Sequence, residues 1–416
     1  METRAQWFRR MASRLRLLLQ CPGWPVSHDE ALSLIVAMVG LRDVSEIEPF
    51  PPTATPSPVD GRAFERLADE IRRQLHITLD PVDLVFLLLT PGDPVQGKIR
   101  KSGPFDVPRV TSEYPWFSHL LLNAIKQLPS LPDFSDDKKV FVMSDFSGEH
   151  RSALYNTYSF IILAQDKIGP FQAKVHELRE KHGLLNPYSE FAYKDLRFGA
   201  RSRALPEFLD LVDNYIHGAV ITLAVEKQIE TLFGPSKPEA HAFLVDQLAA
   251  LGFGQWKGPD AEKVSRVCHT LAVFASLLTS AGQRLLWYCD NDTINVDGKR
   301  RTFAHTQELF KAVWGMYATQ PLDVIGFGRS FEDKSYLDDL LSVADFAAGV
   351  VQDLLQGNAT GADISGGDEK LRVIRWAASP ARFLSKINIQ ISRMENGEVG
   401  SGLVAMNLKD EQPDLA

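Results

Sequence analysis

Three acidic residues stand in the sequence where carboxylates are expected to meet in space. Asp145 and Asp290 each directly follow or end an apolar run typical of a buried strand. In open α/β sheets, strand ends of this kind form the edge at which ligands bind. Asp345 lies on the apolar stripe of an expected helix, between Leu341 and Ala348. A carboxylate in that place needs a cation or a basic partner to stay ionised.

Carboxylates that converge from two strand ends and one helix suit a divalent metal ion. Mg²⁺ takes hard oxygen ligands in octahedral geometry and leaves positions for water and phosphate. Two such ions roughly 3.5 to 4 Å apart can activate a water and stabilise a leaving oxygen. We therefore predict a site for Mg²⁺ or Mn²⁺ that hydrolyses phosphodiester bonds.

Two of these acids have competitors in the sequence. Asp292 competes with Asp290, because a shift of one residue reverses which side chain faces the site. Asp338 lies seven residues before Asp345, on the same face of the expected helix. The interpretation prefers Asp290 and Asp345, and both alternatives stay open at this stage.

The surrounding sequence predicts a domain of alternating strands and helices over residues 138–356. Apolar, β-branched runs predict strands at 138–145, 158–164, 219–225, 285–289 and 322–328. Patterns with a spacing of three and four predict helices at 166–183, 206–216, 238–251, 261–279, 303–318 and 336–355. An opening hairpin followed by this alternation predicts an α/β fold, with a mixed sheet covered by helices on both faces.

Two further regions flank this domain. Residues 1–137 are expected to form a mostly helical accessory region, interrupted by a proline-dense linker at 49–58. This region is also the candidate site for a protein partner. Residues 357–416 are expected to form a linker and a C-terminal β-hairpin that turns at Asn396-Gly397.

Two motifs in the central domain carry a resemblance to a known family. They are Asp145-Phe146-Ser147-Gly148, at the end of the first strand, and Ala344-Asp345-Phe346-Ala347-Ala348-Gly349, in the closing helix. The domain resembles the ribonuclease H-like family catalogued as domain of unknown function 3800, in which an Asp-Glu-Ser-Gly motif ends the first strand. The resemblance implies a ribonuclease H-like fold in which Glu190, in an extended segment, and Lys227, after the third strand, complete the site.

The resemblance implies a metal-dependent nuclease that acts on RNA or DNA, with bacterial defence as its setting. Two departures bear on this expectation: Phe146 replaces the family's glutamate, and Glu190 lacks the histidine that usually follows it. The alternative is a catalytically inactive ribonuclease H-like module that binds or scaffolds a protein or nucleic-acid partner.

Charge and cysteine content limit the partners and the compartment. The net charge of −8 argues against a general affinity for polyanions. Nucleic acid is therefore expected to bind through local basic clusters, namely Arg197, Arg201 and Arg203 together with Lys299, Arg300 and Arg301. The 3 scattered cysteines suit a reducing compartment, so a cytoplasmic protein without membrane contact is expected.

Overall fold

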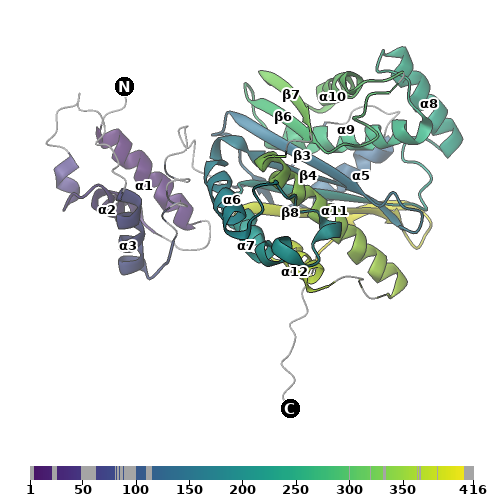
Figure 1. The fold of residues 1–416 in the computed structure, drawn as a ribbon. Coiled ribbons are helices and arrows are strands. Elements are labelled where there is room, and N and C mark those ends of the chain that lie inside the picture. The colour runs from purple at the N-terminus through teal and green to yellow at the C-terminus, as the bar shows by residue number, and fades with distance from the viewer. Residues whose placement is uncertain are drawn as a thin grey trace.

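A mixed sheet with helices on both faces forms the centre of the molecule (Figure 1). The computed structural model describes residues 4–20, 26–47, 62–79, 81, 84, 88, 100–108, 115–298, 300–318, 320–330, 334–362, 364, 367–381 and 383–406. The predicted linker at 49–58 and the predicted cation Lys299 lie outside these residues. Within the described residues, no helix is long and apolar enough to cross a membrane.

The sheet has seven strands in the order β7-β6-β3-β4-β5-β8-β9. These strands are β3 (Lys139–Ser147), β4 (Tyr155–Ala164), β5 (Gly218–Glu226), β6 (Arg284–Cys289), β7 (Val324–Arg329), β8 (Leu384–Arg393) and β9 (Val399–Leu403). The first three form an antiparallel meander, whereas β6 and β7 run parallel to β3. The predicted α/β class, with a mixed sheet, is confirmed.

Two groups of helices cover the two faces of the sheet. One face carries α5 (Pro115–Ile125), α8 (Lys237–Ala250), α9 (Gly258–Leu278) and α10 (Phe303–Tyr317). The other carries α6 (Gly169–His182), α7 (Gly199–Tyr215), α11 (Tyr336–Thr360) and α12 (Asp368–Ala378). Successive residues of a strand point to opposite faces. In β3, Val142 accordingly joins the core under α9, while Met143 joins the core under α11.

Two predicted helix boundaries differ from the structure. The helix expected from Pro206 begins at Gly199, and Pro206 lies inside it. Proline had suggested a start because it is favoured in a first helical turn. The linker expected after residue 356 instead continues α11 to Thr360, and α12 follows.

The N-terminal helices form a cluster of their own. They are α1 (Arg4–Gln20), α2 (His28–Met38) and α3 (Ala63–Leu75), with a short 3₁₀ helix, η1 (Val44–Ile47). Their buried side chains pack together with Phe383, which immediately precedes β8. The C-terminal hairpin turns at Asn396-Gly397, and β8 pairs with β5. This hairpin is therefore part of the main sheet.

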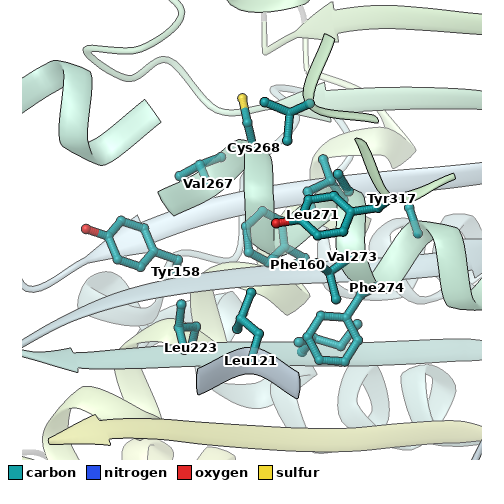
Figure 2. Close-up of a cluster of buried hydrophobic side chains, with 14 of the residues drawn as sticks. Leu121, Tyr158, Phe160, Leu223, Val267, Cys268, Leu271, Val273, Phe274 and Tyr317 are labelled. Atoms are coloured by element: carbon teal, nitrogen blue, oxygen red, sulfur yellow. The ribbon is translucent and has the colours of Figure 1, made fainter. Parts of the chain in front are cut away.

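The described residues between Phe105 and Phe134 contribute to the central core, although they precede the predicted boundary at 137/138. Leu121 and Phe134 are fully buried in the same cluster as Phe160 of β4. Figure 2 shows Leu121 of α5 next to Leu223 of β5, below the side chains of α9. The two-stranded sheet of β1 (Arg100–Ser102) and β2 (Ser130–Pro132) brackets this segment. The central unit thus begins near residue 100.

A truncation series tests this boundary. A chain that lacks residues 1–99 is expected to unfold cooperatively, because it keeps every element of the central core. A chain that lacks residues 1–137 also loses Leu121 and Phe134 from that core. Each large buried apolar side chain contributes roughly 2 to 5 kcal/mol, so the summed loss exceeds the stability of a typical domain. Thermal melts followed by near-UV circular dichroism should show no cooperative transition for the shorter chain; equal melting temperatures would contradict this boundary.

Candidate functional site

Asp145 lies beside Asp290, which directly follows β6. The strand expected to end at Asp145 continues to Ser147, so Asp145 lies two residues before the end of β3. Ser144 of β3 is in register with Cys289 of β6, and the Asp290 N–H donates to the Ser144 carbonyl oxygen at 3.3 Å. Neighbouring strands are roughly 4.8 Å apart, so the two aspartates leave adjacent positions at the same edge of the sheet. Asp145 has the same parity as Met143 and faces α11.

Asp345 reaches Asp145 from α11, which packs across this face. The Thr157 hydroxyl of β4 donates to the Ala348 carbonyl oxygen at 3.1 Å and ties the helix to the sheet. The carboxyl groups of Asp145 and Asp345 lie within hydrogen-bonding reach of each other. Two carboxyl oxygens at this separation form a hydrogen bond only when one of them is protonated.

Burial and mutual repulsion favour the protonated form of this pair. Burial raises the pKa of Asp145 well above its ordinary value, and the charges of Asp345 and Asp290 raise it further. Burial also raises the pKa of Asp345 to about 6, although the Tyr193 N–H donates to this carboxylate. The negative charges of Glu190 and Asp290 add to the shift of Asp345. All four predicted carboxylates therefore act on one another electrostatically.

Glu190 approaches this group from the segment between α6 and α7. Its carboxylate forms an ion pair with Lys334 at 3.1 Å, and Lys334 also contacts Asp338 at 3.3 Å. Lys334 is thus a cation in contact with a predicted site residue, although it was not among the residues predicted from the sequence. In the sequence, the indication of this role is that Lys334 directly precedes Ser335, the N-cap of α11.

A buried arginine holds the Glu190 segment in place. Arg179 of α6 forms an ion pair with Asp339 of α11, and both side chains are almost fully buried. Its Nη1 also donates to the carbonyl oxygens of Leu184 at 3.0 Å and Ser189 at 2.8 Å. The backbone on the N-terminal side of Glu190 is thus fixed to the same helix that carries Asp345.

Tyr193 fixes the other side of this segment. Its N–H donates to Asp345 Oδ2 at 2.6 Å, and its hydroxyl donates to Asp353 Oδ2 at 3.0 Å. The Tyr193 ring lies against Gly349, where an added Cβ would be 2.2 Å from a ring carbon. Because Gly349 has no side chain, the Tyr193 ring fits against α11, where the Tyr193 N–H orients Asp345.

The structure places the competing acids away from the carboxylate pair. Asp292 is bound by Lys263 of α9 at 2.6 Å, on the other face of the sheet. Asp338 accepts from the Ser335 N–H at 2.8 Å and closes the capping box of α11. Both acids have structural partners, whereas Asp290 and Asp345 lie beside Asp145.

Lys227 and Phe146 do not join the group. Thr222 is aligned with Asp145 through Ser159, and Lys227 follows five residues later, roughly 16 Å farther along the strand direction. There its Nζ donates to the His150 carbonyl oxygen at 2.7 Å. The Phe146 ring packs at 5.8 Å from that of Tyr158, under α9. The predicted departure at Phe146 thus lies on the opposite face from Asp145.

The two predicted basic clusters lie on different faces. Arg201 donates to the Glu190 carbonyl oxygen at 3.1 Å, beside the candidate site. Arg301 instead stacks on Trp256, with its guanidinium carbon 3.9 Å from the ring centroid, and Arg300 bonds to Gln255 at 3.0 Å. Arg300 and Arg301 thus contact the segment between α8 and α9. Of the two clusters, only the one that contains Arg201 lies beside the carboxylates.

The donor set fits a divalent cation in its chemistry, although the side chains are not arranged as a preformed metal site. Within the described residues, no three histidine, cysteine, aspartate or glutamate side chains already form a metal-binding group. Asp145 and Asp345 face each other, and Glu190 is turned to Lys334. Among the described residues, Lys334 is paired with Glu190 and Arg201 contacts the Glu190 backbone, but no cation forms an ion pair with Asp145, Asp290 or Asp345. A hard cation would neutralise the negative charge of these carboxylates.

The sequence matches no protein-family model, no curated protein and no solved structure. The resemblance to domain of unknown function 3800 therefore stays a prediction. The argument for the site depends on the placement of Asp145, Glu190, Asp290 and Asp345 alone.

The raised pKa of Asp345 predicts a dependence of stability on pH. Between its ordinary value of 3.8 and its value in the fold, about 6, the folded state binds more protons than the unfolded state. The free energy of unfolding therefore falls as the pH rises through this range and stays lower above it. Asp345→Asn removes this cost, so the variant should be more stable than the wild type by on the order of 2 kcal/mol at about pH 8. Urea denaturation at several pH values measures this difference, which should vanish near about pH 4; a variant less stable than the wild type at both ends would contradict it.

Gly349→Ala tests the contact that orients Asp345. The new Cβ would lie 2.2 Å from the Tyr193 ring, so the ring must move and its bonds to α11 must weaken. We expect a loss of roughly 1 to 3 kcal/mol in the free energy of unfolding, typical of overpacking. Gly315→Ala in α10 is the matched control, because no atom lies within 4 Å of its added Cβ. This control should leave stability unchanged or raise it slightly; equal effects of both changes would show that Tyr193 does not constrain Gly349.

Proposed function

We propose that this chain is a metal-dependent nuclease of ribonuclease H-like fold, which hydrolyses phosphodiester bonds of RNA or DNA. The observation that carries the proposal is the convergence of Asp145, Glu190, Asp290 and Asp345 from two strand ends, one helix and one clamped segment. The order of these elements along the chain also agrees with the order that the resemblance implies: strand, hairpin strand, helix, glutamate, strand, strand, closing helix.

The four carboxylates would hold Mg²⁺ or Mn²⁺. When bound, such ions supply positive charge that stabilises the transition state of phosphodiester hydrolysis and that helps to activate a water. A proton held by Asp145 or Asp345 would have to be released before both could act as ligands. Asp290 directly follows β6 and lies beside Asp145, and Glu190 would have to exchange Lys334 for the cation. Tyr193 and Arg179 keep Asp345 and the Glu190 segment in place during this exchange.

Proton release makes metal affinity dependent on pH. Because the pKa of Asp345 is raised to about 6, Mn²⁺ should bind at least several-fold more tightly at about pH 7.5 than at about pH 5.5. Cleavage of labelled RNA, DNA and hybrid substrates should require the same cation and stop in chelator. Asp290→Asn should lower cleavage by several orders of magnitude, roughly the effect of losing about 4 kcal/mol of transition-state stabilisation.

Asp292→Asn is the matched control for Asp290→Asn. It changes the same acid to the same amide two residues away, but Asp292 lies on Lys263 under α9. The control should bind Mn²⁺ and cleave as the wild type does. Cleavage that survives chelator, or that falls equally in the two variants, would overturn the proposed role of the carboxylates. Metal binding without cleavage of any substrate would leave a binding module as the better account.

A further inference from the structure

An exposed aromatic side chain stands beside the candidate site. Phe198 is 77% exposed, the highest value among the large apolar side chains that the structure describes. Its φ is +67°, and among the described non-glycine residues only His76 shares this left-handed conformation. A bulky residue rarely adopts such a φ, because it strains the backbone. Neither burial nor a favourable backbone conformation therefore explains why this position holds a phenylalanine.

Basic residues lie close to this phenylalanine in the sequence, and one of them contacts its ring. Lys194, Arg197 and Arg203 are exposed, and the Arg197 guanidinium carbon lies 6.0 Å from the centroid of the Phe198 ring. In the described part of the chain, neither Lys194 nor Arg203 forms an ion pair with a carboxylate. Uncompensated cations next to a solvent-facing ring match the chemistry of a nucleotide, whose phosphate is anionic and whose base is flat.

A small cleft lies at the foot of this surface. It has a volume of about 220 Å³, and its lining includes Tyr193, Lys194, Arg197 and Lys370. The Lys370 ammonium lies 4.7 Å from the centroid of the Tyr193 ring and is bonded to Asp353. Three cations, the Glu369 side chain and one aromatic ring therefore border a concave space large enough for a phosphate and part of a sugar.

This basic surface is continuous with the carboxylate group. Tyr193 lines the cleft, and its N–H is bonded to Asp345 at 2.6 Å. Phe198 follows Tyr193 by five residues, so its Cα lies at most roughly 18 Å from that of Tyr193. Arg201, on the first turn of α7, is bonded to the backbone of Glu190. A strand bound along Phe198 and the cleft would reach the carboxylates within a few nucleotides.

We propose that Phe198, Lys194, Arg197 and Arg203 form a binding surface for single-stranded nucleic acid that leads into the carboxylate site. The inference names the substrate class of the proposed nuclease and so rests on that proposed function. An unpaired base stacks on the Phe198 ring, and the cations contact the phosphates on either side. Duplex bases are stacked on one another and cannot cover an isolated ring, so the surface selects unpaired strands.

Binding measured in chelator tests this inference apart from catalysis. We would measure fluorescence anisotropy with labelled single-stranded RNA, single-stranded DNA and the matched duplexes, using the full chain. Phe198→Gly should weaken single-strand binding roughly five- to hundred-fold, because base stacking is lost. The same variant should melt at the same temperature as the wild type or higher, because glycine relieves the strained φ. Phe198→Trp should keep the affinity, since tryptophan also stacks.

Charge changes give an independent signature. Lys194→Ala and Arg203→Ala should each lower the slope of log affinity against log salt by roughly 0.7 for a single strand. Lys257→Ala and Phe243→Ala are the matched controls, because both positions lie on the α8 and α9 side of the sheet. Neither control should change binding or the salt slope.

The outcomes separate the two proposals. Single-strand binding that depends on Phe198, without metal binding or cleavage, would support this surface and overturn the nuclease. Metal-dependent cleavage with no effect of Phe198→Gly on binding or on substrate preference would support the nuclease and overturn this surface. Equal affinity for duplex and single strand, unaffected by Phe198→Gly, would also overturn it.

Discussion

The close approach of the Asp145 and Asp345 carboxyl groups is the interaction on which this site depends. Two acids held against each other in a half-buried position cannot both ionise at low cost, so burial and repulsion raise the pKa of each. A fold gains nothing in stability from this arrangement. Tyr193, Thr157 and Gly349 nevertheless provide contacts or space that hold α11 and its aspartate over β3. Ligand-binding sites typically contain ionisable groups that lower the stability of the fold, held in place by stabilising contacts around them.

The surroundings of the pair divide into fixed and exchangeable contacts. Arg179 is buried against Asp339 and fixes the backbone that precedes Glu190. Lys334 is partly exposed and balances Glu190 and Asp338. A partly exposed lysine can leave its carboxylate at little cost, whereas a buried arginine cannot. The frame of the site is therefore rigid, while the charge within it can be exchanged for a bound cation.

Local patterns sufficed to predict the elements that carry the carboxylates. The apolar runs and the apolar stripe predicted the elements near these acids: Asp145 lies in β3, Asp290 directly follows β6, and Asp345 lies in α11. Lys227 lies elsewhere, since its distance from Asp145 depends on strand register across three strands. Lys334 and Tyr193 were missed because their partners are far away in the sequence. The contribution of α5 and Phe134 to the core was missed for the same reason: α5 has a helical pattern whichever surface it covers.

A crystal structure of the protein soaked in Mn²⁺, with anomalous scattering data, tests the central claim most directly. The account predicts an anomalous peak between Asp145 and Asp345, with Asp290 among the ligands and Glu190 released from Lys334. It also predicts that the peak is absent from crystals of Asp145→Asn. No peak at this position in the wild type, with the Asp145–Asp345 hydrogen bond and the Glu190–Lys334 ion pair intact, would contradict the account.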